Sequence, residues 1–219
     1  MPRILFSKTG DAIWISHLDL MRLFQRAFKR AGLPLKHTQG YNPRPSVSIA
    51  LPLSVGVESV RELLDFELDG MQVSNEEILE RLNAVLVDGI FVLSVYDDGR
   101  KIKDLTHLHC AVTLEYDRCL PADAEEKLKT LFERDSLLVE KKSKNGTKEQ
   151  DIIPMMRNTV VERFDAHSIQ IRSMIACQNP SMNPMQIVTA VERYLPELKP
   201  DFVKCQRIEL YDENDQYFR

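Results

Sequence analysis

The sequence predicts an α+β protein of two ferredoxin-like halves, in which antiparallel sheets carry their helices on one face. In residues 1–99, β-prone runs and two amphipathic stretches follow the order β-α-β-β-α-β. The same order of elements returns in residues 100–219, although the two halves differ in sequence. A charged segment, residues 97–101, lies between them as a junction. We therefore expect two domains, residues 1–99 and residues 100–219.

The first half is expected to open with a β-hairpin. Residues 4–7 and 12–15 are apolar and β-prone, and the turn formers of residues 8–11 lie between them. After the first helix, further apolar patterns predict strands at residues 46–51, 63–68 and 90–96. Ser74 is expected to cap a second helix whose apolar residues run from Ile78 to Leu86.

The first helix has the clearest start and stop signals. Ser16 is a good N-cap, and Asp19 follows three residues later, where its carboxylate can reach back as in a capping box. Apolar residues recur with the helical period between residues 20 and 31. Gly32 and then Pro34 are expected to end the helix.

The second half is predicted from weaker patterns of the same kind. Strands are expected at residues 107–116, 137–142, 160–164, 168–176 and 202–211, and helices at residues 122–134 and 184–195. The Lys-rich residues 141–148 are expected to form a solvent-exposed hairpin tip, where a run of charge usually serves only solubility.

Composition and motifs exclude several classes of protein. No apolar run reaches the roughly 20 residues needed to span a bilayer, and the N-terminus lacks the pattern of a secretory signal. The four cysteines contain no Cys-x-x-Cys pair and are interpreted as reduced thiols. We therefore expect a cytoplasmic protein with no membrane association, no metal site and no bound cofactor. P-loop, dinucleotide-binding, Gly-x-Ser-x-Gly and zincin motifs are also absent from the sequence.

Positive charge is concentrated at the beginning of the chain. Residues 1–50 carry eight Lys or Arg against two acids, a balance of +6, although the whole chain has a net charge of −4. The remaining residues therefore carry −10. Such an asymmetry indicates an acidic partner for the basic segment, and RNA is the one we favour.

The candidate binding residues follow one another along the first helix and the loop after it. Arg22 and Arg26 are expected on the helix face opposite the apolar one, and the loop combines Gly, aromatic, amide and Arg residues between two prolines. Arginines would hold phosphates, Tyr41 would stack on a base, and Gln39 and Asn42 would contact polar base edges. The full candidate set is Arg22, Arg26, Arg30, Lys36, His37, Gln39, Gly40, Tyr41, Asn42 and Arg44. For the helical arginines alone, an ordinary exposed helix face is an equally good interpretation.

An enzymatic alternative depends on three other residues. His17 at the helix start and His37 are the histidines of the basic segment, and with Asp19 they are the candidates for acid–base catalysis. They could supply at most three metal ligands, without the spacing of a known metal motif. No complete catalytic constellation is recognisable, which favours binding over catalysis.

Four segments closely resemble one bacterial family of unknown function, the radical SAM-linked family. They are Phe6-Ser7-Lys8-x-Gly10, the helix start from Ile15 to Ala27, the Gly40–Pro45 loop, and Leu51-Pro52-Leu53-x-Val55-Gly56-Val57-Glu58-Ser59. The resemblance implies an accessory role beside a cobalamin-binding radical SAM protein, which here would act in trans.

Together these observations favour a non-catalytic RNA-binding or substrate-presenting accessory protein, with tRNA or rRNA as possible partners. Two alternatives stay open: a metal-independent RNA-processing or RNA-modifying enzyme using His17 or His37, and a protein-interaction module for the radical SAM partner.

Overall fold

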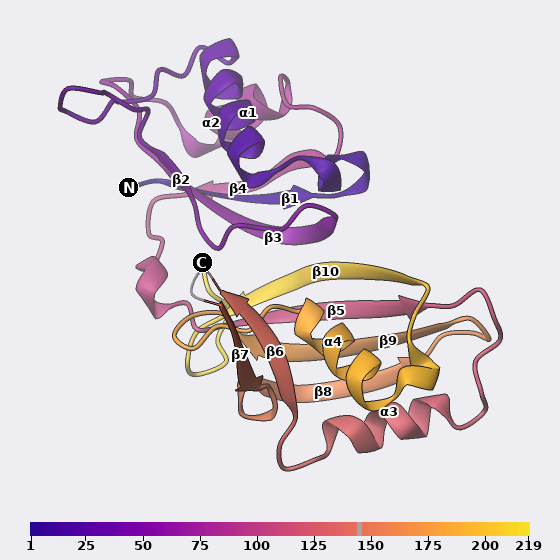
Figure 1. Ribbon diagram of the computed structural model, residues 1–219. Coiled ribbons are helices and arrows are strands. Elements are labelled where there is room, and N and C mark those ends of the chain that lie inside the picture. The colour runs from indigo at the N-terminus through magenta and orange to yellow at the C-terminus, as the bar shows by residue number, and fades with distance from the viewer. Residues whose placement is uncertain (144–145) are drawn as a thin grey trace. The chain divides into compact units, whose positions relative to one another are not determined.

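The computed structural model describes residues 1–143 and 146–219 and divides the chain into two compact units (Figure 1). The first unit contains Met1–Asp104 together with Phe218–Arg219, and the second contains Leu105–Tyr217. The expected mixture of helices and antiparallel strands is confirmed, with four α-helices among the described residues. None of the helices within the described ranges is long and apolar enough to cross a membrane.

The first unit contains an antiparallel sheet in the order β4-β1-β3-β2, and α1 and α2 cover one of its faces (Figure 1). Its elements are β1 (Arg3–Lys8), the 3₁₀ helix η1 (Gly10–Trp14), α1 (His17–Arg30), β2 (Val47–Ile49), β3 (Val57–Phe66), α2 (Asn75–Asn83), β4 (Ile90–Tyr96) and the 3₁₀ helix η2 (Ile102–Asp104). Ser74 caps α2 as expected, by accepting a hydrogen bond from the Glu77 amide at 3.2 Å.

The predicted opening hairpin is wrong. β1 pairs with β3 on one side and with β4 on the other, so neither of its edges is free for residues 12–15. Residues 12–14 instead belong to η1, whose Ala12 is buried, and Ile15 is its C-cap. The Thr9 amide donates to the Gly89 carbonyl at 2.8 Å, and a Cβ at Gly89 would lie 2.8 Å from that of Ala12. An apolar run of four residues does not distinguish a short strand from a buried 3₁₀ turn.

Four phenylalanines form the centre of the first core and set the rotation of α1. Phe24 packs edge-on against Phe6 with ring centroids 4.8 Å apart, and Phe28 packs against Phe66 at 5.0 Å. All four side chains are fully buried. Because Phe24 and Phe28 turn one side of α1 to the sheet, the arginines of this helix lie on its exposed side.

The last two residues of the chain complete the first unit. Phe218 is fully buried, and the guanidinium groups of Arg3 and Arg100 lie over its ring, 5.7 and 4.8 Å from the centroid. Arg3 also makes a two-pronged ion pair with Asp65 of β3, at 2.6 and 3.1 Å. A charged side chain in this core is therefore paired with a carboxylate and stacked on an aromatic ring.

The second unit contains an antiparallel sheet in the order β10-β5-β9-β8 and a separate two-stranded sheet, β6-β7 (Figure 1). Its elements are β5 (His107–Glu115), α3 (Ala124–Phe132), β6 (Leu138–Ser143), β7 (Gly146–Asp151), the 3₁₀ helix η3 (Ile153–Met155), β8 (Met156–Arg163), β9 (Ser168–Ala176), α4 (Met185–Tyr194), the 3₁₀ helix η4 (Pro196–Leu198) and β10 (Phe202–Tyr211).

Sequence patterns matched most strands of this unit and missed one. The predicted bounds of β9 and β10 are confirmed. β7 was not predicted, because its residues Gly-Thr-Lys-Glu-Gln-Asp show no apolar alternation. Part of the expected hairpin tip, residues 144–145, lies outside the described residues.

Candidate functional site

The start of α1 is organised by the predicted cap. The Asp19 amide donates to Ser16 Oγ at 3.2 Å, and the Ser16 hydroxyl donates to Asp19 Oδ2 at 2.8 Å. Arg22 Nη1 lies 2.9 Å from Asp19 Oδ1. The hydrogen bond from Ser16 and the interaction with Arg22 lower the pKa of the Asp19 carboxyl. Asp19 therefore binds the hydroxyl of the capping residue Ser16, rather than its backbone amide, and orients Arg22.

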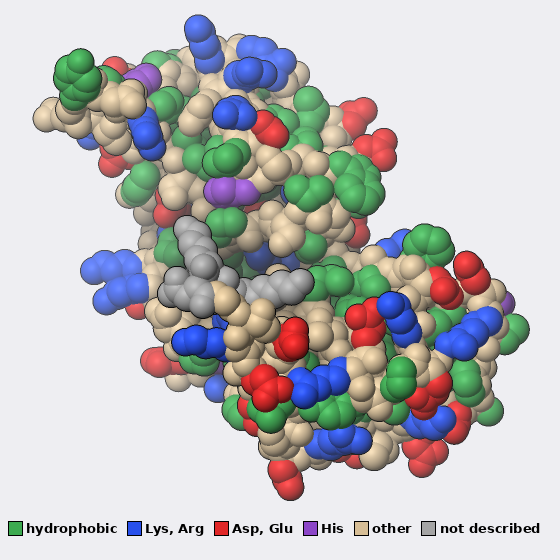
Figure 2. Space-filling view, in the orientation of Figure 1, with side chains coloured by type: hydrophobic (Ala, Val, Ile, Leu, Met, Phe, Trp, Pro, Cys, Tyr) green, Lys and Arg blue, Asp and Glu red, His purple; other side chains and the backbone are tan. Residues whose placement is uncertain are grey.

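Three arginines of α1 line one hollow of about 460 Å³. Arg22, Arg26 and Arg30 share it with Asp19 and with three apolar residues, Ile15, Leu23 and Val87. Within the described part of the chain, neither Arg26 nor Arg30 has a carboxylate within ion-pair distance. Figure 2 shows Lys and Arg side chains gathered over α1 at the top of the first unit. The arrangement can hold anionic groups such as phosphates, because guanidinium groups present several donors in a fixed plane.

The loop after α1 has a hydrogen-bonded base and an exposed tip. The Thr38 amide donates to the Arg44 carbonyl at 2.8 Å, and the Arg44 amide donates to Thr38 Oγ1 at 3.0 Å. Gly40 has φ +134°, a conformation that favours glycine, and Tyr41 is fully exposed. The tip therefore presents an aromatic ring beside exposed Gln39, Asn42 and Arg44 side chains on a closed loop.

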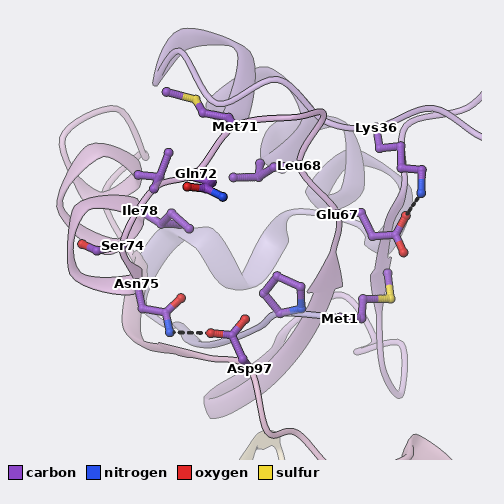
Figure 3. Close-up of a pocket in the computed structure, with 12 residues that line it drawn as sticks. Met1, Lys36, Glu67, Leu68, Met71, Gln72, Ser74, Asn75, Ile78 and Asp97 are labelled. Carbon is purple, nitrogen blue, oxygen red and sulfur yellow. Dashed lines mark hydrogen bonds and ion pairs between the residues drawn. The ribbon is translucent and has the colours of Figure 1, made fainter.

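The remaining basic candidates lie elsewhere on the first unit. His37 lines a second hollow of about 370 Å³ together with Lys29, Gln25 and apolar residues. Lys36 lines a third hollow of about 680 Å³ and forms an ion pair with Glu67 at 3.2 Å (Figure 3). The structure thus brings Arg22, Arg26 and Arg30 together and places His37 and Lys36 in separate hollows. The exposed loop tip, residues 39–44, lines none of these three hollows.

The hollow around Lys36 is unsuited to an anion. Besides the ion pair of Lys36 with Glu67, Asn75 Nδ2 donates to Asp97 Oδ2 at 2.9 Å across its rim (Figure 3). Leu68 and Ile78 supply apolar lining. Its lysine is therefore paired, and both carboxylates would repel a phosphate.

The three residues of the enzymatic alternative do not form one site. Asp19 is bound to Ser16 and Arg22, and His37 lies in the second hollow. Nδ1 of His17 is shielded from solvent and has no hydrogen-bond partner among the described residues. The described residues also contain no group of three or more His, Cys, Asp or Glu side chains that could hold a metal ion.

Sequence reasoning missed the residues that complete the arginine hollow. Val87 comes from the turn between α2 and β4, far from α1 in the sequence, and no local pattern connects it to the arginines. Ile15 was expected in a strand, whereas it is the residue that links η1 to the cap of α1. Only the tertiary packing brings these apolar walls to the arginines.

The structure defines a two-unit α+β protein with an arginine-lined hollow on one face of α1. The chain belongs to the family described as "Uncharacterized protein conserved in bacteria (DUF2344)", whose model matches residues 2–184. No curated protein matches the chain in sequence.

Solved structures resemble the chain at low sequence identity. A Cbf5-Nop10-Gar1 complex contains a chain that is 9% identical, with a TM-score of 0.51, over 97% of this chain and 50% of that one. A chain of an H/ACA RNP bound to a substrate RNA has 9% identity and a TM-score of 0.48, over 94% of this chain and 46% of that one. The chain therefore spans about half the length of these matched structures, and the likeness concerns the fold alone.

Proposed function

We propose that this protein is a non-catalytic RNA-binding or substrate-presenting accessory protein. The observation that carries the proposal is the hollow on α1, where Arg22, Arg26 and Arg30 converge and, among the described residues, only Arg22 is paired with a carboxylate. Three guanidinium groups four residues apart on one helix form a row of about 12 Å. Such a row matches a polyanion better than it matches a single small anion.

The loop tip supplies the second part of the proposed surface. Tyr41 is fully exposed, and Gln39, Asn42 and Arg44 flank it on a loop whose base is hydrogen-bonded. An exposed aromatic ring next to an arginine suits an unpaired base and its phosphate. In this role Gln39 and Asn42 contact polar base edges, and Arg44 contacts the backbone.

The scaffold and the partner are also part of the proposal. The strand orders β4-β1-β3-β2 and β10-β5-β9-β8 support two ferredoxin-like units, with β6 and β7 inserted in the second. The resemblance of residues 6–59 to radical SAM-linked proteins supports a cytoplasmic accessory role beside a radical SAM enzyme that acts in trans. In that role this protein would hold an RNA, such as tRNA or rRNA, for the enzyme.

The test compares two triple variants with equal changes of charge. In the first, Arg22, Arg26 and Arg30 are replaced by Gln. In the control, the exposed Lys148, Lys199 and Lys204 of the second unit are replaced by Gln. Binding of fluorescently labelled tRNA and rRNA fragments is followed by anisotropy at several salt concentrations.

We expect the arginine variant to bind about 50-fold more weakly at 0.15 M salt, since each lost phosphate contact removes about 0.7 from the log–log salt slope. Its slope should fall by about 2, while the control keeps the slope of the natural protein. Equal binding by the arginine variant and the natural protein would refute the proposal. A nuclease-resistant complex with a radical SAM protein, lost on replacing Tyr41 and Arg44, would instead favour a protein-interaction module.

A further inference from the structure

The only tryptophan of the chain, Trp14, is 67% exposed at the end of η1. A side chain of this size is usually buried for much of its surface, because it offers more apolar area than most residues. Leu18, in the first turn of α1, is similarly exposed at 66%. The start of α1 therefore presents an aromatic and an aliphatic side chain to solvent.

The backbone that carries Trp14 is firmly held. The Ile13 carbonyl accepts two hydrogen bonds of 2.9 Å, one from the ammonium group of the buried Lys8 and one from the Gly56 amide. Ala12, two residues before Trp14, is buried against Gly89. Contacts with Lys8, Gly56 and Gly89 thus hold the two residues that precede Trp14 in the absence of a ligand.

The indole ring lies against a glycine. A Cβ built on Gly56 would come within 3.4 Å of Trp14 Cζ3, and Gly56 itself has φ +82°. The ring therefore rests on bare backbone and keeps most of its surface open. Because the backbone that carries the ring is already hydrogen-bonded, stacking with a planar ligand costs little further backbone entropy.

The charge of the neighbouring helix selects the kind of ligand. After Leu18, Arg22 and Arg26 follow at steps of four residues, about 6 Å each along the helix axis. Between Trp14 and Arg26 the chain thus carries an exposed aromatic ring, an exposed aliphatic side chain and two exposed guanidinium groups. An unpaired nucleotide strand offers the matching features, since its bases stack on aromatic rings and its phosphates bind arginines.

We propose that an unpaired nucleotide of the bound RNA stacks on Trp14 while the adjoining phosphates contact Arg22 and Arg26. This inference rests on the proposed RNA-binding function and deepens it. The ligand is RNA with an unpaired base at the N-terminal end of α1, because bases inside a paired duplex stack on one another and offer no free face to Trp14.

The test uses Trp14 as its own reporter, since its emission is the only tryptophan signal of the protein. Unlabelled single-stranded RNA and a blunt duplex of the same sequence are titrated into the full chain. We expect the single strand to quench the emission and to protect the indole from acrylamide, and the duplex to do neither. Trp14→Ala should weaken single-strand binding, measured by anisotropy, about 5- to 150-fold. Trp14→Phe should retain most of the affinity, and Phe164→Ala, which removes an exposed ring of the second unit, should retain all of it.

The outcomes separate this inference from the function on which it rests. Arginine-dependent RNA binding without a change in Trp14 emission overturns the stacking and leaves the RNA-binding function standing. Equal losses of single-strand and duplex binding in Trp14→Ala also overturn it, because they indicate a structural role.

If the natural protein binds neither RNA, both proposals fail. A Trp14 response to a radical SAM protein, but not to RNA, assigns the surface to a protein partner and overturns the inference. The emission and acrylamide measurements on the natural protein decide the question even if Trp14→Ala does not fold.

Discussion

Replacing Gly89 by Ala should destabilise the first unit through two separable effects. Gly89 has φ +83°, and an L side chain in a left-handed conformation costs about 1–2 kcal/mol. In addition, the new Cβ would lie 2.3 Å from the Thr9 carbonyl oxygen and 2.8 Å from the Ala12 Cβ. Neither atom is the end of a flexible side chain, so the turn before β4 must move away from Thr9 and Ala12, at a further cost of about 1–3 kcal/mol. The expected loss is about 2–5 kcal/mol in the free energy of unfolding.

Gly70→Ala is the matched control for the backbone effect. Gly70 has φ +65°, and a Cβ added there would meet no atom within 4 Å, so this variant should lose only about 1–2 kcal/mol. Urea unfolding followed by Trp14 emission reports on the first unit, which contains the only tryptophan. With a slope of about 1–3 kcal/mol per molar urea, the two variants should differ by about 1 M in midpoint. Equal midpoints would refute the argument that the contact of Gly89 with Thr9 and Ala12 holds η1.

Three further predictions concern groups outside the proposed RNA surface. Burial raises the pKa of Tyr116 to about 12, and its hydroxyl donates to a backbone carbonyl at 2.8 Å. Because the folded protein disfavours the ionised phenol, this contribution to the free energy of unfolding is present below pH 10 and is lost as the pH rises toward 12. Tyr116→Phe should lower the free energy of unfolding by about 1 kcal/mol and remove this pH dependence, as urea titrations at pH 9 and 11 would show. Asp65→Ala, which leaves the buried Arg3 without its carboxylate, should cost about 3–5 kcal/mol, and an Arg3→Met, Asp65→Leu double variant should cost clearly less. Cys119 is exposed, whereas burial raises the pKa of the other three thiols, so a thiol reagent at neutral pH should modify Cys119 alone, as peptide mass spectrometry would show. Fast modification of a second cysteine in the folded protein would contradict the described burial.

The helices were predictable because their signals are local. Ser16 and Ser74 each accept a hydrogen bond from the amide three residues later, as their positions before apolar-periodic segments predicted. Strands failed where the pattern was short or polar. Residues 12–15 have the composition of a strand, but β1 already pairs on both edges, and that is a property of the whole sheet. β7 is a polar strand that depends on β6 for its pairing.

The candidate site was predictable as a set of residues but not as an arrangement. A helical spacing of four residues was enough to place Arg22, Arg26 and Arg30 on one side of α1. The sequence did not indicate that Glu67 pairs with Lys36, since the two lie on different segments. The exposure of Trp14 was not predicted for another reason. The expected strand would have buried part of its side chain, whereas in the 3₁₀ turn it is 67% exposed.

These positions change what kind of binding surface α1 can form. If Arg22, Lys36, His37 and Arg44 had met in one cleft, a small anion or a reactive phosphate would have been the natural ligand. Instead Lys36 is paired with Glu67 and His37 lies in a separate hollow. The arginines of α1 form a row on a helix of 14 residues, about 21 Å long, with exposed Trp14 just before its start and exposed Tyr41 in the loop after its end. In the proposed function, a row of cations with an aromatic residue beyond each end would contact several successive nucleotides. Under the proposed function, this geometry would serve to hold an RNA strand, and the chemistry would belong to a partner enzyme.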